Sequence, residues 1–301
     1  MLGAAFAHEG LVRSPQLTVA TAWTVDPLAL LPLALAAWLY WRGSLRAGPR
    51  QACFAAGMAA IFLALVWPLD ALGERLFSAH MAQHLVLMNL AAPLLVLGAP
   101  VPAMLRALPR DMRSALARLG AGRRWRAGWQ VLSHVACATV LQQAMLWTWH
   151  MPPAIAAALE SDVLHIAMHA SLLAAALVFW TAILRPSSGG TWGSIAALLF
   201  TLKISGLACI ALLVREGTLY PVYGDSAAAW GLSPTEDEQL GWGLMMAMGA
   251  ATYLAAALAL SARALVSLER AHAGPRPTAS TATSATCGGA APTFRRTGGS
   301  R

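Results

Sequence analysis

Four histidines form two HxxxH pairs, His80 with His84 and His165 with His169, and a fifth, His150, closes another apolar segment. A spacing of four residues places both members of a pair on one helix face. Imidazoles are costly in hydrocarbon, where they are tolerated mainly when paired, hydrated or bound to a metal. We therefore predict that His84 and His169 bind a metal ion or a cofactor, with interhelical hydrogen bonding as the alternative. His80, His165 and His150 are predicted to admit the ion or to complete the site.

Methionines add a second kind of donor to these apolar segments. Met88 shares a helical stripe with His80 and His84, and Met245 lies near the start of the last apolar run. Thioethers mixed with imidazoles suit copper, above all Cu(I), better than zinc or magnesium. Met88 and Met245 are therefore candidate copper ligands, and packing in an apolar helix is the alternative for each.

The elements that must position these residues are transmembrane helices. Hydrophobic residues make up 58% of the chain and charged residues 11%, with a mean hydropathy of +0.58, which indicates an integral membrane protein. Pro93 is predicted to kink the third apolar run. We predict an all-α polytopic protein with seven transmembrane helices, each near the length of about 20 residues that spans a bilayer. The runs are 24–41, 51–69, 79–97, 130–149, 163–184, 192–214 and 240–266.

Arginines gather in alternate loops, most densely over residues 106–126. Short arginine-rich loops stay in the cytoplasm, so we predict an N-out, C-in topology with all five histidines in the outer leaflet. Residues 1–23 are then a short extracytoplasmic segment, 24–271 the seven-helix domain, and 272–301 a disordered cytoplasmic tail. The net charge of +8 indicates contact with anionic membrane lipid and gives little reason to expect nucleic acid binding.

Four further polar residues lie where they could serve the histidines. Gln83 could orient an imidazole by a hydrogen bond or bridge two helices. Asp162 and Asp237 precede or open apolar runs, so they could orient imidazoles, attract a cation, or simply begin a helix. Lys203, the one lysine of the chain, lies midway along the sixth run. We expect it to face the bundle or to be neutral, and to pack with polar neighbours, with a proton relay or a counter-charge as the alternative.

Several ordered motifs resemble one family. HMAQH followed by AAPLLVLGAP, then WHMPP, HIAMH, LYPVYG and WGLSPTEDEQLGWGLMM are similar to the heptahelical CtaG family of cytochrome c oxidase assembly factors, across some 170 residues. A single-span copper chaperone of the same name is not similar. Where many relatives read like two glycines followed by Met-Trp, this chain has Gly241, Trp242, Gly243 and then Met245. The resemblance implies functional roles for His80, Gln83, His84, Trp149, His150, His165, His169, Tyr220, Tyr223, Asp237 and Gln239.

The resemblance implies that the chain helps to assemble a haem–copper oxidase in the bacterial cytoplasmic membrane. Its partners would then be oxidase subunits and periplasmic copper chaperones, and its cargo copper. Two rivals use the same residues: a haem protein with two imidazole ligands, and a metal transporter or proton-coupled carrier in which Lys203 is the midplane charge. The sequence contains no Walker loop, dinucleotide fingerprint or serine nucleophile elbow, so we do not expect an enzyme.

Overall fold

The computed structural model describes residues 18–45, 48–185 and 190–272, and all the regular structure in these residues is helical. The predicted all-α class is therefore confirmed. The chain divides into two compact units, residues 1–264 and 265–301. Residues 1–17 of the predicted N-terminal segment, 1–23, and residues 273–301 of the predicted tail, 272–301, lie outside the described residues.

Each of the seven predicted runs coincides with a helix or a row of joined helices. Helices long and apolar enough to cross a membrane are Phe77–Gly98, Asp162–Leu184, Gly190–Leu213 and Pro234–Arg270. The others have 17, 17 and 15 residues, so the count of seven spans and the N-out orientation stay predictions. The elements are α2 (Pro27–Gly43), α3 (Pro49–Leu65), α5 (Phe77–Leu85) with η2 (Val86–Ala91) and α6 (Ala92–Gly98), α10 (Val135–Trp149), α12 (Asp162–Leu184), α13 (Gly190–Leu213) and α14 (Pro234–His272).

Exposed side chains on these helices support a membrane location. Leu31, Trp38, Phe200 and Leu258 are each more than half exposed, and many other large apolar side chains of α2, α13 and α14 are exposed too. Extended exposed apolar surface of this kind marks a site of membrane or protein contact. Together with the four spanning helices, it identifies an integral membrane protein.

Shorter helices connect the apolar ones. The arginine-rich stretch expected as a loop is instead helical, as α8 (Arg110–Ala121) and α9 (Arg123–Leu132), and neither helix has a buried residue. Alanine, leucine and arginine favour helix even without burial, which explains the difference. The remaining connectors are α4 (Leu69–Gly73), α7 (Pro100–Ala107), α11 (Pro152–Glu160) and the short 3-10 turns η1 (Val19–Thr21), η3 (Pro221–Tyr223) and η4 (Ser226–Trp230).

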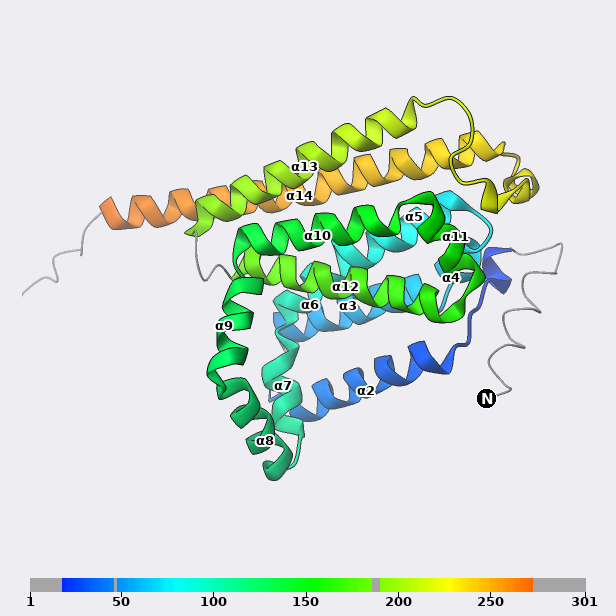
Figure 1. Ribbon diagram of the computed structural model, residues 1–301. Coiled ribbons are helices and arrows are strands. Elements are labelled where there is room, and N and C mark those ends of the chain that lie inside the picture. The colour runs from blue at the N-terminus through cyan, green and yellow to red at the C-terminus, as the bar shows by residue number, and fades with distance from the viewer. Residues whose placement is uncertain (1–17, 46–47, 186–189, 273–301) are drawn as a thin grey trace, which may run out of the picture. The chain divides into compact units, whose positions relative to one another are not determined.

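The core centres on α12, which packs against α10 on one side and against η2 and α6 on another (Figure 1). Leu172, Ala176 and Phe179 of α12 are fully buried in this contact. Because α12 carries His165 and His169 near its start, its packing fixes where that pair lies relative to α5 and α10.

The third predicted run changes its helical pitch instead of running straight. Residues Val86–Ala91 form a π-helical stretch, directly before Pro93 in the first turn of α6. Proline has no N–H to donate, and a wider π turn absorbs the resulting break in the hydrogen-bond ladder. The indole Nε1 of Trp180 donates to the carbonyl oxygen of Met88 at 2.9 Å, which satisfies one backbone group of this stretch. This change of pitch begins seven residues, about two α-helical turns, before Pro93, and the kink expected there stays a prediction.

Candidate metal centre

Five imidazoles from three helices meet in the interior. α5 contributes His80 and His84, α12 contributes His165 and His169, and His150 caps the end of α10. All five are buried, with exposed fractions between 0% and 8%. The sequence predicted the two pairs from their spacing, and the packing of α5, α10 and α12 brings the pairs together. We call these five residues the histidine cluster.

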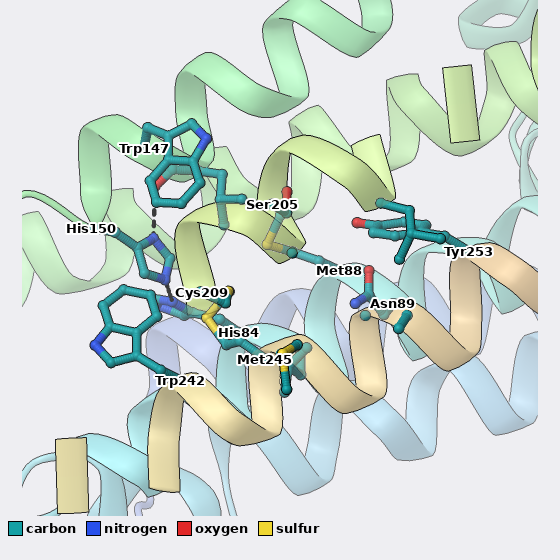
Figure 2. Close-up of a pocket in the computed structure, with 17 residues that line it drawn as sticks. His84, Met88, Asn89, Trp147, His150, Ser205, Cys209, Trp242, Met245 and Tyr253 are labelled. Carbon is teal, nitrogen blue, oxygen red and sulfur yellow. Dashed lines mark hydrogen bonds between the residues drawn. The ribbon is translucent and has the colours of Figure 1, made fainter. Parts of the chain in front are cut away.

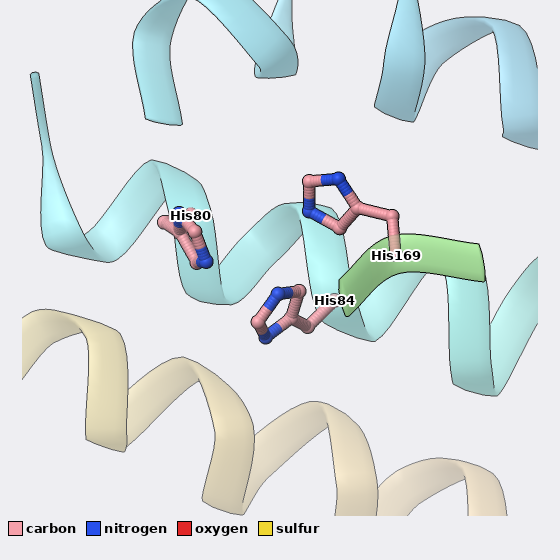
Figure 3. Close-up of side chains that lie close together, drawn as sticks. All are labelled: His80, His84 and His169. Atoms are coloured by element: carbon pink, nitrogen blue, oxygen red, sulfur yellow. The ribbon is translucent and has the colours of Figure 1, made fainter. Parts of the chain in front are cut away.

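The rings of the cluster lie within contact distance of one another. The ring centroid of His84 is 4.5 Å from that of His80, 5.3 Å from that of His169 and 5.0 Å from that of His150. His165 lies 4.6 Å from His169 and 5.9 Å from His80. Figure 3 shows His169 reaching from its own helix toward the face of α5 that carries His80 and His84.

Several ring nitrogens of the cluster have no hydrogen-bond partner. They are both ring nitrogens of His80 and the Nε2 atoms of His84, His165 and His169. A buried polar atom left without a partner costs about 1–3 kcal/mol, so such atoms are rare unless they serve a function. Neutral imidazole nitrogens with a free lone pair are the commonest metal ligands in proteins. The arrangement can therefore hold a cation by ligation.

Two groupings of donor atoms meet a geometric condition for a metal site. One nitrogen each from His80, His84 and His169 lie within 4.8 Å of one another, and so do donor atoms of Asp70, His165 and His169. His169 belongs to both groupings. The carboxylate of Asp70 is buried, and burial raises its pKa while the neighbouring His165 lowers it.

His150 orients His84. Its Nδ1 lies 2.6 Å from the carbonyl oxygen of Leu146, which can only accept, so this Nδ1 carries the proton. Its Nε2 is then an acceptor and lies 3.4 Å from Nδ1 of His84. His84 donates from Nδ1, and its Nε2 keeps a free lone pair. Figure 2 shows both contacts.

A cavity of about 80 Å³ adjoins His84 and His150. Met88 and Met245, both predicted as candidate ligands, line it together with Trp242 (Figure 2). Met88 is 4% exposed and packs in the core. The two thioethers thus share one cavity with two imidazoles of the cluster.

A larger cavity of about 860 Å³ adjoins the two histidines of α12. His165 and His169 line it, together with Asp70 and with apolar side chains of α2, α3, α6 and α12. Asp162, one of the predicted accessory residues, is exposed in the first turn of α12 and also lines this cavity.

Asp237 acts on a helix rather than on an imidazole. Its carboxylate accepts hydrogen bonds from the backbone N–H groups of Phe77, at 2.6 Å, and Ser78, at 3.1 Å, and from the hydroxyl of Ser78. It therefore caps the start of α5 from the first turn of α14. Gly241 permits this close approach, because a Cβ there would lie 2.7 Å from Cδ1 of Phe77.

Gln83 also bonds elsewhere than to a histidine. Its Nε2 donates to Oδ1 of Asp70 at 2.8 Å and to the carbonyl oxygen of Ala64 at 2.9 Å. It positions the Asp70 carboxylate and ties α5 to α3. Of the two alternatives predicted for Gln83, the bridge between helices is therefore found, and no hydrogen bond from Gln83 to an imidazole occurs in the described residues.

Lys203 is exposed on α13, so its side chain does not face the bundle, and the alternative expectation, that it is neutral, stays a prediction. The polar contact of this helix does not involve Lys203: Nε2 of Gln143 on α10 donates to the hydroxyl of Ser205 at 3.2 Å. Thr201 is buried.

Two further carboxylates, Asp70 and Glu238, contribute to the site. Asp70 directly follows the apolar run 51–69, a position that indicates a carboxylate at the end of a span. Glu238 accepts from the backbone N–H groups of Leu219, at 2.8 Å, and Tyr220, at 2.7 Å. The hydroxyl of Tyr220 in turn donates to the carbonyl oxygen of His150 at 2.7 Å, and burial raises the pKa of this hydroxyl. Glu238 and Tyr220 thereby hold the end of α10 that presents His150.

Comparison with known proteins gives one family. The sequence model of the cytochrome c oxidase caa3 assembly factor family (Caa3_CtaG) matches residues 22–267, which span every residue of the histidine cluster. No curated protein and no solved structure matches the chain. The match confirms the resemblance that the motifs indicated.

Proposed function

This chain belongs to the cytochrome c oxidase caa3 assembly factor family, and we propose that it serves oxidase assembly by holding copper at the histidine cluster and passing it on. The cargo is Cu(I), the recipient is a haem–copper oxidase, and periplasmic copper chaperones supply the ion. The protein crosses the bacterial cytoplasmic membrane several times, with the cluster near the outer side.

One observation carries this proposal: four buried ring nitrogens, both of His80 and the Nε2 atoms of His84 and His169, lack a partner in the described residues. His80, His84 and His169 supply nitrogens close enough together to converge on one ion. Imidazole is a good ligand for copper, and a thioether favours Cu(I) over harder ions. Met88 and Met245 are available beside His84 to complete such a site.

Delivery requires an ion that can leave, so the site must not be closed on all sides. Closed four-coordinate sites are typical of structural metals, whereas sites with an open position exchange ligands. The histidine cluster adjoins two cavities, which leaves room for an incoming or outgoing ligand. This openness supports transfer rather than permanent storage.

The decisive experiment compares copper content in the wild-type protein and the His84→Ala/His169→Ala double variant. Both are purified in detergent from cells grown with copper, and copper is measured by mass spectrometry. We expect the double variant to lose its copper, because each of the two groupings loses a donor. His134→Asn is the matched control, because His134 is exposed and lies outside the cluster at the start of α10. Copper that persists at the wild-type level in the double variant would falsify the ligand assignment.

A haem ligated by two histidines is the rival that uses the same residues. The porphyrin must lie between its two axial imidazoles, yet the rings of the cluster lie against one another, with centroids 4.5 to 5.9 Å apart. This contact favours a bare ion. An absorption spectrum of the purified protein separates the two, because bound haem gives an intense Soret band and Cu(I) gives none.

A further inference from the structure

The histidine cluster adjoins two cavities, and of these only the larger is lined by carboxylates. His84 and His150 line the smaller cavity with the sulfur atoms of Met88 and Met245. His165 and His169 line the larger cavity together with three carboxylates, among them Asp70, and with the thioethers of Met58 and Met104. His80 lines neither cavity, is fully buried, and lies with its ring centroid 4.5 Å from that of His84 and 5.8 Å from that of His169. An ion that arrives through the larger cavity therefore meets His165 and His169 before it meets His80 or His84.

Asp70 adds a charged donor at this point. It is 7% exposed, it lines the larger cavity, and Gln83 holds its Oδ1 by a 2.8 Å hydrogen bond. One of its oxygens lies within 4.8 Å of donor nitrogens of His165 and His169. The Nε2 atoms of these two histidines are buried and unpartnered. The carboxylate and one ring nitrogen from each histidine form a second donor set, which shares only His169 with the grouping of His80, His84 and His169.

We propose that Asp70, His165 and His169 form a second metal position, the access position, which binds a divalent transition-metal ion and admits copper to His80 and His84. The admission of copper rests on the proposed function, whereas the binding of a divalent ion does not. A carboxylate with two imidazoles is a donor set found at catalytic zinc sites, and it is harder than imidazoles mixed with thioethers. The access position therefore holds Zn(II) well and Cu(I) weakly.

The shared ligand gives this position its role. His169 belongs both to the access position and to the grouping with His80 and His84. An ion can pass from one set to the other by exchanging Asp70 and His165 for His80 and His84. Weak binding of Cu(I) at the first position and tighter binding at the second gives the transfer its direction.

The shared ligand also makes the two positions compete. Two cations this close repel each other, and His169 has to serve both. A divalent ion at the access position therefore lowers the affinity of the other grouping for Cu(I), and Cu(I) lowers the affinity for the divalent ion by the same factor.

The test measures Zn(II) binding and Cu(I) uptake on the full chain in detergent. Zn(II) affinity is measured by titration, and Cu(I) uptake by stopped-flow loss of colour from a Cu(I)–chelator complex. We expect Asp70→Asn to weaken Zn(II) binding and to slow Cu(I) uptake, each by about tenfold or more, while the equilibrium affinity for Cu(I) stays within about twofold. The amide keeps an oxygen that accepts from Gln83, so the hydrogen bond to α5 persists.

His165→Gln is the second variant, because it removes the other donor that only the access position uses. Glu160→Gln is the matched control, since Glu160 is exposed near the start of α12 and lines neither cavity. The proposal is overturned if Asp70→Asn and His165→Gln both bind Zn(II) as the wild type does, if Cu(I) uptake keeps its rate, or if both variants lose Cu(I) affinity together with Zn(II). A wild type that binds Zn(II) through Asp70 but no Cu(I) contradicts the proposed function instead.

Discussion

The Nδ1 atom of His84 lies 3.4 Å from the Nε2 atom of His150, and this contact joins α5 to the end of α10. The carbonyl oxygen of Leu146 determines the tautomers of both rings, because it can only accept and so keeps the proton of His150 on Nδ1. His84 therefore presents the lone pair of Nε2 to the interior of the cluster. Both ring nitrogens of His150, a candidate ligand by its position in the sequence, are engaged, so we predict that it orients His84 instead of binding the ion.

Replacing His150 should weaken copper binding without removing a ligand. We expect His150→Phe to lower the affinity for Cu(I) by about 10- to 100-fold, because His84 loses the acceptor that fixes its tautomer. Affinity is measured by competition with a Cu(I) chelator. X-ray absorption should count the same number of imidazole ligands as in the wild type, and His150→Gln, which can still accept a hydrogen bond, should recover part of the affinity. A lower imidazole count in His150→Phe would make His150 a direct ligand.

Removing the carboxylate of Asp237 should destabilise the fold. The variant Asp237→Ala leaves the backbone N–H groups of Phe77 and Ser78 without their acceptor, so we expect a loss of about 2 kcal/mol in the free energy of unfolding. Thermal unfolding in detergent, followed by circular dichroism, measures the effect. Asp237→Asn keeps one acceptor oxygen and should lose less. Equal stability of the wild type and Asp237→Ala would show that the cap does not contribute.

The thioethers of Met88 and Met245 should contribute to the affinity for Cu(I) and not to the affinity for Zn(II). Met88→Leu and Met245→Leu conserve volume, so the fold should change by less than about 1.5 kcal/mol. Where the thioether binds copper, the Cu(I) affinity should fall by about tenfold while the Zn(II) affinity stays unchanged. Met168→Leu is the control, because Met168 is fully buried on α12 and lines neither cavity. If both leucine variants bind Cu(I) as tightly as the control, the two methionines are packing residues.

Lys203 should be dispensable for metal handling. Because its side chain lies on the exposed face of α13, we expect Lys203→Met to keep the copper content of the wild type within about twofold and to support oxidase assembly in cells. Metal flux into proteoliposomes tests the rival transporter function directly. Flux that occurs with the wild type and disappears in Lys203→Met would favour a transporter with a functional midplane charge.

Local sequence determined the helices and the faces they present. The apolar runs predicted α5, α12 and α14, because hydrophobic length and periodicity are properties of a segment and its solvent. The HxxxH spacing placed His80 with His84 and His165 with His169, since a helix repeats every 3.6 residues. The arginine-rich stretch, which we expected to be a loop, is helical. The distribution of charge indicates which side of the membrane a segment faces, but it does not indicate whether the segment is helical.

Only the tertiary structure decided which donors meet. Asp70 is 95 residues from His165 in the chain, and no local pattern links them; they meet because α12 packs against η2 and α6, while α4, which carries Asp70, packs against α5. The same holds for His150 with His84, and for Asp237 with the start of α5. Which side chains meet across two helices depends on whether the helices pack together and on their relative position along the helix axes. The packing of the whole core determines both, and neither segment does so alone. The sequence thus determined that histidines face the interior, and the packing decided that they converge and that a carboxylate joins them.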